Sequence, residues 1–250
     1  MRRILDRVTV TGADDAVSPA TLGMLADIYP RTEWGILVSE NKTIIAGGTP
    51  RFPSLEWLHR LHGEACCREM QLSLHLCGRW VRELCAGSWG GLVKALGEVM
   101  DVFQRIQLNF HSRVHAIDEM VFTKELCLLD GQFNASKQYV FQLDDVNDWI
   151  ASCAYDAGLD VGVLYDKSGG AGVLPGQWTK PMAGIYTGYA GGLGPENVAA
   201  QLAKIEELVG DDPTWIDAET RVRTDEQFDQ EKVDAFLCEA APWVLTEVGV

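Results

Sequence analysis

The sequence has 250 residues, which is long for one average domain but suits a single α/β barrel. Its composition, 47% hydrophobic and 23% charged, is typical of an ordinary globular protein and includes no apolar run that would span a membrane. The net charge of −15 repels nucleic-acid backbones and anionic membranes, so we expect neither as a partner. Seven cysteines without a C-x-x-C pair and an N-terminus without an apolar leader predict a cytoplasmic protein with reduced thiols.

Short apolar segments, rich in β-branched, aromatic or leucine residues, alternate with segments that have helical spacing. In chain order, strands are expected at residues 7–12, 34–40, 71–77, 105–111, 138–144, 160–166, 183–190 and 214–219. Helices are expected at residues 18–29, 54–62, 90–102, 146–157, 195–209 and 230–239. This alternation predicts an α/β fold, a (β/α)₈ TIM barrel that forms a single domain over residues 1–250. An open doubly wound sheet is the alternative, but no G-x-G-x-x-G motif follows the first strand.

Polar or ionisable residues stand at the ends of most of the expected strands. They are Thr11, Glu40, His75, Asn109, His111, Asp144, Asp166, Asp217 and Glu219. In a barrel these strand ends converge on one mouth, where active sites are built. The alternative for each residue is an ordinary role: Asp144 can cap the helix that follows, and Asp217 can pair with a neighbour in the barrel wall.

Two glycine-rich segments carry the most specific signal. The first follows the sixth strand, where Asp166 precedes a loop that contains Gly169, Gly170, Gly172 and Gly176. An aspartate at a strand end is suited to general acid or base catalysis, and glycines let backbone amides approach an anion. The second joins the seventh strand to a helix through Gly191 and Gly192, and the amides at a helix start bind phosphate.

These segments resemble phosphoribosylanthranilate isomerase, a barrel enzyme of tryptophan biosynthesis. Leu164-Tyr165-Asp166, the following GGAG and Trp178 are similar to the family's catalytic strand end, G-G-T-G loop and aromatic residue. Residues 190–198, AGGLGPENV, are similar to the family's A-G-G-L-x-P-E-N-V. Residues 49–54 resemble S-x-R-Y-V-S, and residues 215–217 resemble V-D-V. The similarity covers the second half of the chain well and the first half weakly.

The resemblance implies an aldose–ketose isomerisation of the Amadori type on an anionic small molecule, without a cofactor. It implies that Asp166 is the catalytic acid and that Arg51 holds a substrate carboxylate. It also implies that phosphate is held by the glycines of the two segments, namely Gly170, Gly172, Gly191 and Gly192.

The sequence departs from the family at four places, one of which is the fourth strand, where QLNFH at residues 107–111 replaces the family's Q-L-H-G. Thr11 stands where the family has its catalytic cysteine base, and a hydroxyl is a poor base without a partner. The base would therefore be an activated Thr11, Asp14 or Asp15. The family's S-S-G-V-E after strand eight is ETRVR here, so Glu219 would repel a phosphate while Arg221 or Arg223 can replace the lost donors. An insertion over residues 41–48 lengthens the loop before Arg51.

Two other functions remain open. His75, His111, Asp144 and Asp166 end four successive strands, and a mixed histidine and carboxylate set suits a divalent metal in a barrel lyase or epimerase. A ligand-binding relative without turnover is the other alternative, favoured by the missing cysteine and disfavoured by the retained Asp166. The sequence does not indicate the oligomeric state.

Overall fold

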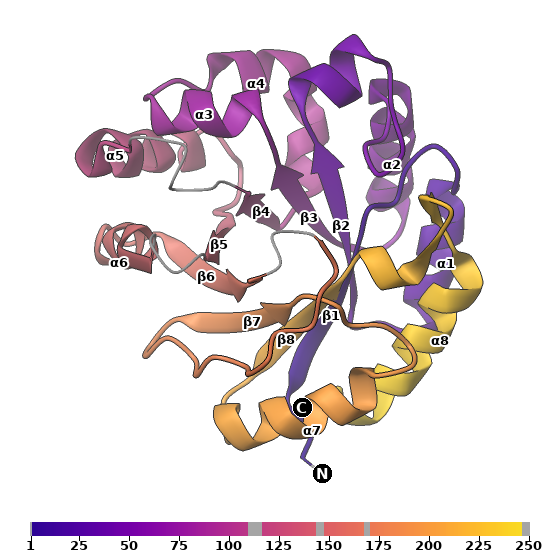
Figure 1. Ribbon diagram of the computed structural model, residues 1–250. Coiled ribbons are helices and arrows are strands. Elements are labelled where there is room, and N and C mark those ends of the chain that lie inside the picture. Colours follow the sequence, from indigo (N-terminus) through magenta and orange to yellow (C-terminus); the bar gives the residue numbers. More distant parts are fainter. Residues whose placement is uncertain (1, 110–116, 144–147, 168–170, 247–250) are drawn as a thin grey trace.

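Eight strands pair in chain order, each parallel to the next, and the last pairs with the first to close a barrel. The computed structural model describes residues 2–109, 117–143, 148–167 and 171–246 (Figure 1). The strands are β1 (Leu5–Thr11), β2 (Thr32–Val38), β3 (Gln71–Leu76), β4 (Arg105–Leu108), β5 (Gln138–Leu143), β6 (Asp160–Tyr165), β7 (Tyr186–Ala190) and β8 (Thr214–Ala218). All eight predicted strands are confirmed, and most end one to three residues earlier than expected.

The helices surround this barrel. They are α1 (Pro19–Ile28), α2 (Leu55–Cys67), α3 (Arg79–Cys85), α4 (Gly90–Leu96), α5 (Glu119–Asp130), α6 (Asp148–Asp156), α7 (Val198–Val209) and α8 (Gln230–Ala240). The Ser18 side chain caps α1 by accepting from the amide of Thr21, as its position before Pro19 predicts. The sequence did not predict α3 or α5, and the predicted helix 90–102 changes to a 3₁₀ turn at Gly97. No described residue between β6 and β7 is helical.

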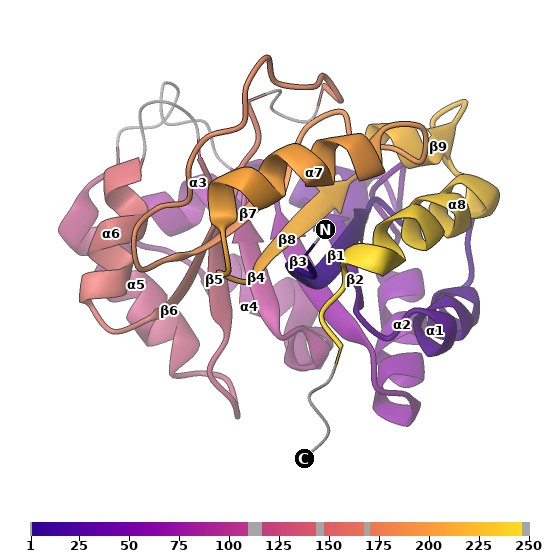
Figure 2. The same ribbon diagram turned by 90° about the horizontal axis from the view of Figure 1, so that it is seen from below.

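Two segments that the sequence did not predict rise at the mouth. The inserted loop before Arg51 contains a π-helical turn, Glu40–Ile45, which Ser39 caps. A small hairpin follows β8, formed by β9 (Arg223–Thr224) and β10 (Gln227–Phe228). Figure 2 shows β9 and the segment after β6 along one edge of the molecule, where the strands end. This edge is therefore the C-terminal mouth of the barrel.

Strand residues alternate between the helix-covered outside and the barrel interior. In β1, Val8 and Val10 join the main apolar core, whereas Thr9 and Thr11 between them belong to a set of buried polar residues. That set continues around the barrel with Glu33, Ser73, His75, Arg105, Gln107 and Asp217. A separate small apolar cluster of Val140, Leu164, Ala190 and Trp215 lies on the other side. The interior is thus mainly polar beside β1–β4 and mainly apolar beside β5–β8, where Asp217 of β8 is a polar exception.

A buried carboxylate between two arginines forms the polar side of this interior. Glu33 Oε1 accepts from Arg105 Nη1 at 2.9 Å and from Thr9 Oγ1 at 2.9 Å, and Oε2 accepts from Arg7 Nη1 at 2.9 Å. The Arg105 guanidinium lies over the indole of Trp215, with Cζ 4.3 Å from the ring centroid. Ionic and cation–π contacts therefore fill the layer that branched aliphatic side chains usually fill in such barrels.

Gly188 of β7 lies against the ring of Trp215, which leaves no room for a side chain. A Cβ on Gly188 would lie 2.1 Å from Trp215 Cε2, so the substitution Gly188→Ala forces this ring or the strand to move. We expect Gly188→Ala to lower the free energy of unfolding by about 1–3 kcal/mol, measured by urea denaturation. Gly63→Ala is the control, because a Cβ there meets nothing within 4 Å and alanine favours the helix. Equal stability of the two variants would contradict the packing described.

All seven cysteines are free thiols in the structure, in agreement with the reduced state expected from the sequence. None of the helices in the described parts of the chain is long and apolar enough to cross a membrane.

Candidate active site

A pocket at the mouth joins the segments that follow β6, β7 and β8. It is lined by Asp166, Gly172, Ala190, Gly191, Gly192, Leu193, Asp217, Ala218, Glu219, Thr220 and Arg221. The two glycine-rich segments and the segment after β8, which lie far apart in the sequence, thus meet at one place. Five of the expected site residues, Asp166, Gly172, Gly191, Gly192 and Arg221, belong to this pocket, together with the strand-end residues Asp217 and Glu219, whereas Thr11 and Arg51 do not line it. Gly170 lies outside the described residues.

The glycines allow the backbones around this pocket to approach closely. A Cβ on Gly192 would lie 2.5 Å from the amide nitrogen of Leu174, and one on Gly172 would lie 2.6 Å from Cβ of Thr220. Both glycines have positive φ, +66° and +67°. Asn197 holds the turn before α7, since its Oδ1 accepts from the Gly194 amide at 3.1 Å and its Nδ2 donates to the Gly192 carbonyl at 2.9 Å. The sequence pattern AGGLGPEN therefore forms a tight, backbone-lined wall.

Asp166 is the first residue after β6 and stands half-buried at the edge of the pocket. Its Oδ2 accepts a hydrogen bond of 3.0 Å from Nε2 of Gln142, near the end of the neighbouring strand β5. The Gln142 amide thus fixes the position of this carboxyl at the mouth.

Asp217 is a second carboxyl at the same pocket. Its Oδ1 accepts a hydrogen bond of 2.7 Å from Oγ1 of Thr11, so the ends of β8 and β1 are joined through these side chains. Burial raises the pKa of Asp217 well above its usual range, the Thr11 hydroxyl lowers it, and the charges of Glu219, Asp166 and Glu33 raise it again. The pairing in the barrel wall that the sequence allowed for Asp217 is present, and its partner is Thr11.

Gly35 makes room for this pair. A Cβ at Gly35 would lie 2.1 Å from Thr11 Oγ1 and 2.9 Å from Nε2 of His75, so any side chain on this residue of β2 would displace the hydroxyl. Thr11 is buried, and the absence of a Cβ opposite it lets its hydroxyl turn into the barrel.

Both arginines expected to bind the substrate are held by carboxylates. Arg51 Nη1 lies 3.2 Å from Glu219 Oε1, and its Nε lies 3.4 Å from Glu226 Oε2. Arg51 has a φ of 74°, which is rare for a residue with a side chain and is typical of strained functional positions. Arg221 Nη1 donates to Glu196 Oε1 at 2.6 Å on the surface. A bound anion would have to replace these carboxylates.

Glu219, which stands where the resembled family has a serine, places a carboxylate at the pocket. Burial raises the pKa of this carboxyl, while the charges of Arg51 and Arg223 lower it. It lies in the pocket and contacts Arg51, so it links the glycine-lined wall to the loop before α2. Arg51 and Asp166 thus lie at the same end of the barrel, as expected.

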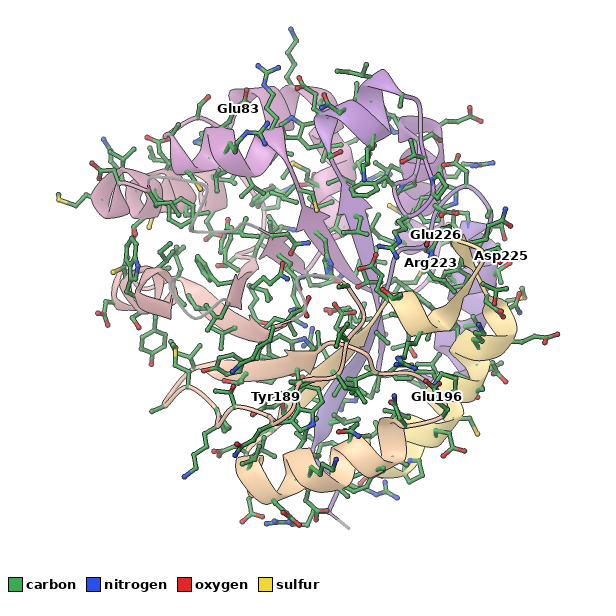
Figure 3. The ribbon with its side chains drawn as sticks, in the orientation of Figure 1. Glu83, Tyr189, Glu196, Arg223, Asp225 and Glu226 are labelled. Atoms are coloured by element: carbon green, nitrogen blue, oxygen red, sulfur yellow. The ribbon has the colours of Figure 1, made fainter. Side chains whose placement is uncertain are left out.

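The hairpin after β8 fastens the loop after β1, which sequence reasoning did not anticipate. Arg223 is buried and donates through Nη2 to Asp14 Oδ2 at 2.9 Å and through Nη1 to the carbonyl of Gly12. The same Asp14 oxygen accepts from the Arg51 amide at 2.7 Å. Figure 3 shows Arg223 beside Asp225 and Glu226 of the turn, with Glu196 on the segment before α7. Arg223 is therefore a structural residue and is not available to clamp a phosphate.

The metal alternative receives no geometric support in the described part of the molecule. His75 is buried beside Gly35, where burial lowers its pKa to about 3, and its Nε2 has no hydrogen-bond partner among the described residues. His111 and Asp144 lie outside the described residues. The residues that are described include no group of three or more His, Cys, Asp or Glu side chains arranged to hold a metal ion.

The contact between Arg221 and Glu196 yields a prediction for anion binding. Glu196→Gln removes the carboxylate that holds the guanidinium, so ribose 5-phosphate should bind a few-fold more tightly in calorimetric titration; exposed pairs of this kind are worth about 0–1 kcal/mol. Glu207→Gln, which makes the same charge change near the far end of α7, is the control. Equal affinities of the two variants would show that Arg221 takes no part in binding.

No known protein family matches the sequence. No relative was found among curated proteins.

Solved structures with this architecture do exist. N-(5′-phosphoribosyl)anthranilate isomerase from Pyrococcus furiosus superposes with a TM-score of 0.55 at 16% identity, over 94% of this chain and 98% of that one. TrpF from Jonesia denitrificans gives 0.55 at 14% identity, over 95% and 97%. A xylose isomerase domain-containing protein from Salmonella typhimurium gives 0.58 at 9% identity, over 97% and 99%. At these identities the similarity establishes the TIM-barrel fold.

Proposed function

We propose that this chain is an isomerase of the phosphoribosylanthranilate isomerase type, which converts an N-glycoside of a sugar phosphate into the corresponding 1-amino-ketose. The observation that carries the proposal is the pocket in which Asp166, Gly172, Gly191, Gly192 and Arg221 meet, with Asp217 beside them. The resemblance singled out Asp166 and the glycines from segments distant in the sequence, and Arg221 stands where the sequence departs from the family. The barrel fold shared with two such isomerases supports the same reaction class.

The residues would divide the work as follows. Asp166 is the general acid that protonates the ring oxygen of the sugar, and Gln142 orients it. The amides near Gly172, Gly191 and Gly192 bind the phosphate, and Arg221 leaves Glu196 to join them. Arg51 binds a carboxylate on the aglycone in place of Glu219. The reaction moves protons only and needs no cofactor.

The substrate must bring its own negative charge to compete for the arginines. Because Arg51 and Arg221 are already neutralised by Glu219, Glu226 and Glu196, a neutral sugar gains little from them. An anion gains a bidentate, charge-assisted contact at each arginine that it captures. This selection favours a substrate with two separated anionic groups, such as a phosphate and a carboxylate.

The test is conversion of N-(5′-phosphoribosyl)anthranilate in D₂O, with the product analysed by NMR and mass spectrometry. The expected result is the 1-amino-ketose with solvent deuterium at C1, because C2 loses its proton and C1 gains one. Binding of this compound without turnover would identify a ligand-binding relative instead. Turnover only after addition of a divalent cation would favour the metal-dependent alternative.

A further inference from the structure

The proposed reaction needs a base, and the residue in the expected place is unsuited to that role. Thr11 carries a hydroxyl, whose proton is far too tightly held at neutral pH for it to act alone. In the structure this hydroxyl is already engaged as a donor, at 2.7 Å from Asp217 Oδ1. The hydroxyl therefore orients Asp217, a carboxyl of β8.

We propose that Asp217 is the general base, with its carboxylate oriented by Thr11, and that Thr11 is a positioning residue. The inference rests on the proposed function and deepens it. Asp217 lines the same pocket as Asp166, and these two carboxyls come from β8 and from the end of β6, the strands on either side of β7. Thr11 occupies Oδ1, and Oδ2 has no hydrogen-bond partner among the residues that the structure describes. The second oxygen is therefore available for the substrate proton.

The steps balance without an oxidant. Asp166 gives a proton to the ring oxygen, the C1–O bond breaks, and the nitrogen lone pair forms the C1=N iminium. Asp217 then takes the proton from C2, whose electron pair forms C1=C2 while the C1=N electrons return to nitrogen. Asp217 returns a proton to C1 as the enol hydroxyl gives its proton to the Asp166 carboxylate, which leaves C2=O. Each carboxyl ends in the state in which it began.

The surroundings of Asp217 make its carboxylate a stronger base than an exposed one. Four residues from different strands face Asp217: Glu219 after β8, Thr11 of β1, Glu33 of β2 and Asp166 after β6. The neighbouring strand β7 contributes Ala190, which does not titrate. His75 of β3 lies beyond Thr11 and Gly35, and Arg7 and Arg105 are bonded to Glu33. Burial and three carboxylates raise the pKa of Asp217, and the Thr11 hydroxyl opposes them. A carboxylate with a raised pKa is a stronger base toward a carbon-bound proton than an ordinary one.

Carbon-13 NMR of aspartate-labelled protein, without any substrate, tests the coupling directly. The Asp217 Cγ signal, assigned by its loss in Asp217→Asn, should titrate at higher pH than the signals of exposed aspartates. Thr11→Val should move this titration to still higher pH, because it removes the donor that stabilises the carboxylate, and Thr11→Ser should leave it in place. Thr9→Val is the matched control, since Thr9 lies on the same face of β1 but donates to Glu33.

Steady-state kinetics of the same variants provide a second test. Asp217→Asn should lower kcat by about 10²–10⁴-fold with little change in KM. Thr11→Val should shift the acid limb of the kcat profile upward by the same amount as the NMR titration, and Thr11→Ser should restore it. The proposal is overturned if Asp217 titrates with the exposed aspartates, if Thr11→Val leaves that titration unmoved, or if Asp217→Asn keeps full turnover. Failure to convert any N-glycoside would overturn the proposed function, while the substrate-free titration would still decide whether Thr11 controls Asp217.

Discussion

Replacing Asp166 by asparagine is expected to reduce turnover of N-(5′-phosphoribosyl)anthranilate by about 10²–10⁴-fold. The amide keeps the size and the hydrogen-bonding position of the carboxyl beside Gln142, but it has no acidic proton to give to the ring oxygen. Substrate affinity should change little, because the phosphate and carboxylate contacts proposed above lie on other residues. Steady-state kinetics, with kcat and KM determined separately, measures the effect.

Asp160→Asn is the control for this variant. Asp160 begins the same strand that Asp166 follows, and its carboxylate accepts from Gln138 at the exposed opposite end of the barrel. It should retain wild-type kcat. Full activity in Asp166→Asn would remove the general acid from the mechanism and with it the residue carried over from the family resemblance.

Glu33→Gln is expected to destabilise the folded protein by about 3–5 kcal/mol, the typical cost of removing one partner from a buried ion pair. The amide leaves the buried Arg105 without its carboxylate partner, while Arg7 keeps only its contact with Asp6. Equilibrium denaturation in urea measures the loss. Glu83→Gln, which removes an exposed carboxylate from its contact with Arg79, should unfold at the wild-type midpoint.

The same residue sets an acid limit on stability. Burial alone would raise the pKa of Glu33, but the charges of Arg105 and Arg7 outweigh it and lower the pKa below its usual range. The stabilisation is therefore complete above the pKa of an unfolded glutamate, about 4.3, and is lost as pH falls through the lower pKa of the folded state. Wild-type protein should lose stability over this acidic window, and Glu33→Gln should lose less. Parallel pH profiles of the two proteins would contradict the buried triad.

The barrel could be predicted because its signals are local. Each strand is a short apolar segment, and caps such as Ser18 before Pro19 mark where a helix begins. The helix α3 escaped prediction because it has only seven residues, which is too short for a periodic pattern to stand out. The hairpin β9–β10 escaped because its turn has Asp225 and Glu226 at positive φ, where glycine or asparagine is the usual signal.

The site was only partly predictable, because several of its side chains pair with residues that lie far away in the sequence. Asp166 and the glycines of AGGLGPENV stand out along the chain, because each belongs to a motif. The partnership of Thr11 with Asp217 joins residues at opposite ends of the sequence, and nothing near either residue indicates the other. In the same way, the carboxylates that hold Arg51 and Arg221 come from separate loops, so the sequence indicated two free cations where the structure has paired ones.

The ion pairs inside the barrel and the candidate pocket at its mouth are formed mainly by different halves of the chain. The charged groups of these pairs come from β1, β2 and β4, whereas the candidate pocket is built mainly by the segments after β6, β7 and β8. Substitutions in the loops after β6–β8 therefore leave the ion pairs of Glu33 with Arg7 and Arg105 in place. Thr11 is the exception, because it belongs to β1 but donates its hydrogen bond to Asp217 of β8. A laboratory evolution campaign would accordingly randomise the loops after β6–β8 and hold β1–β4 constant.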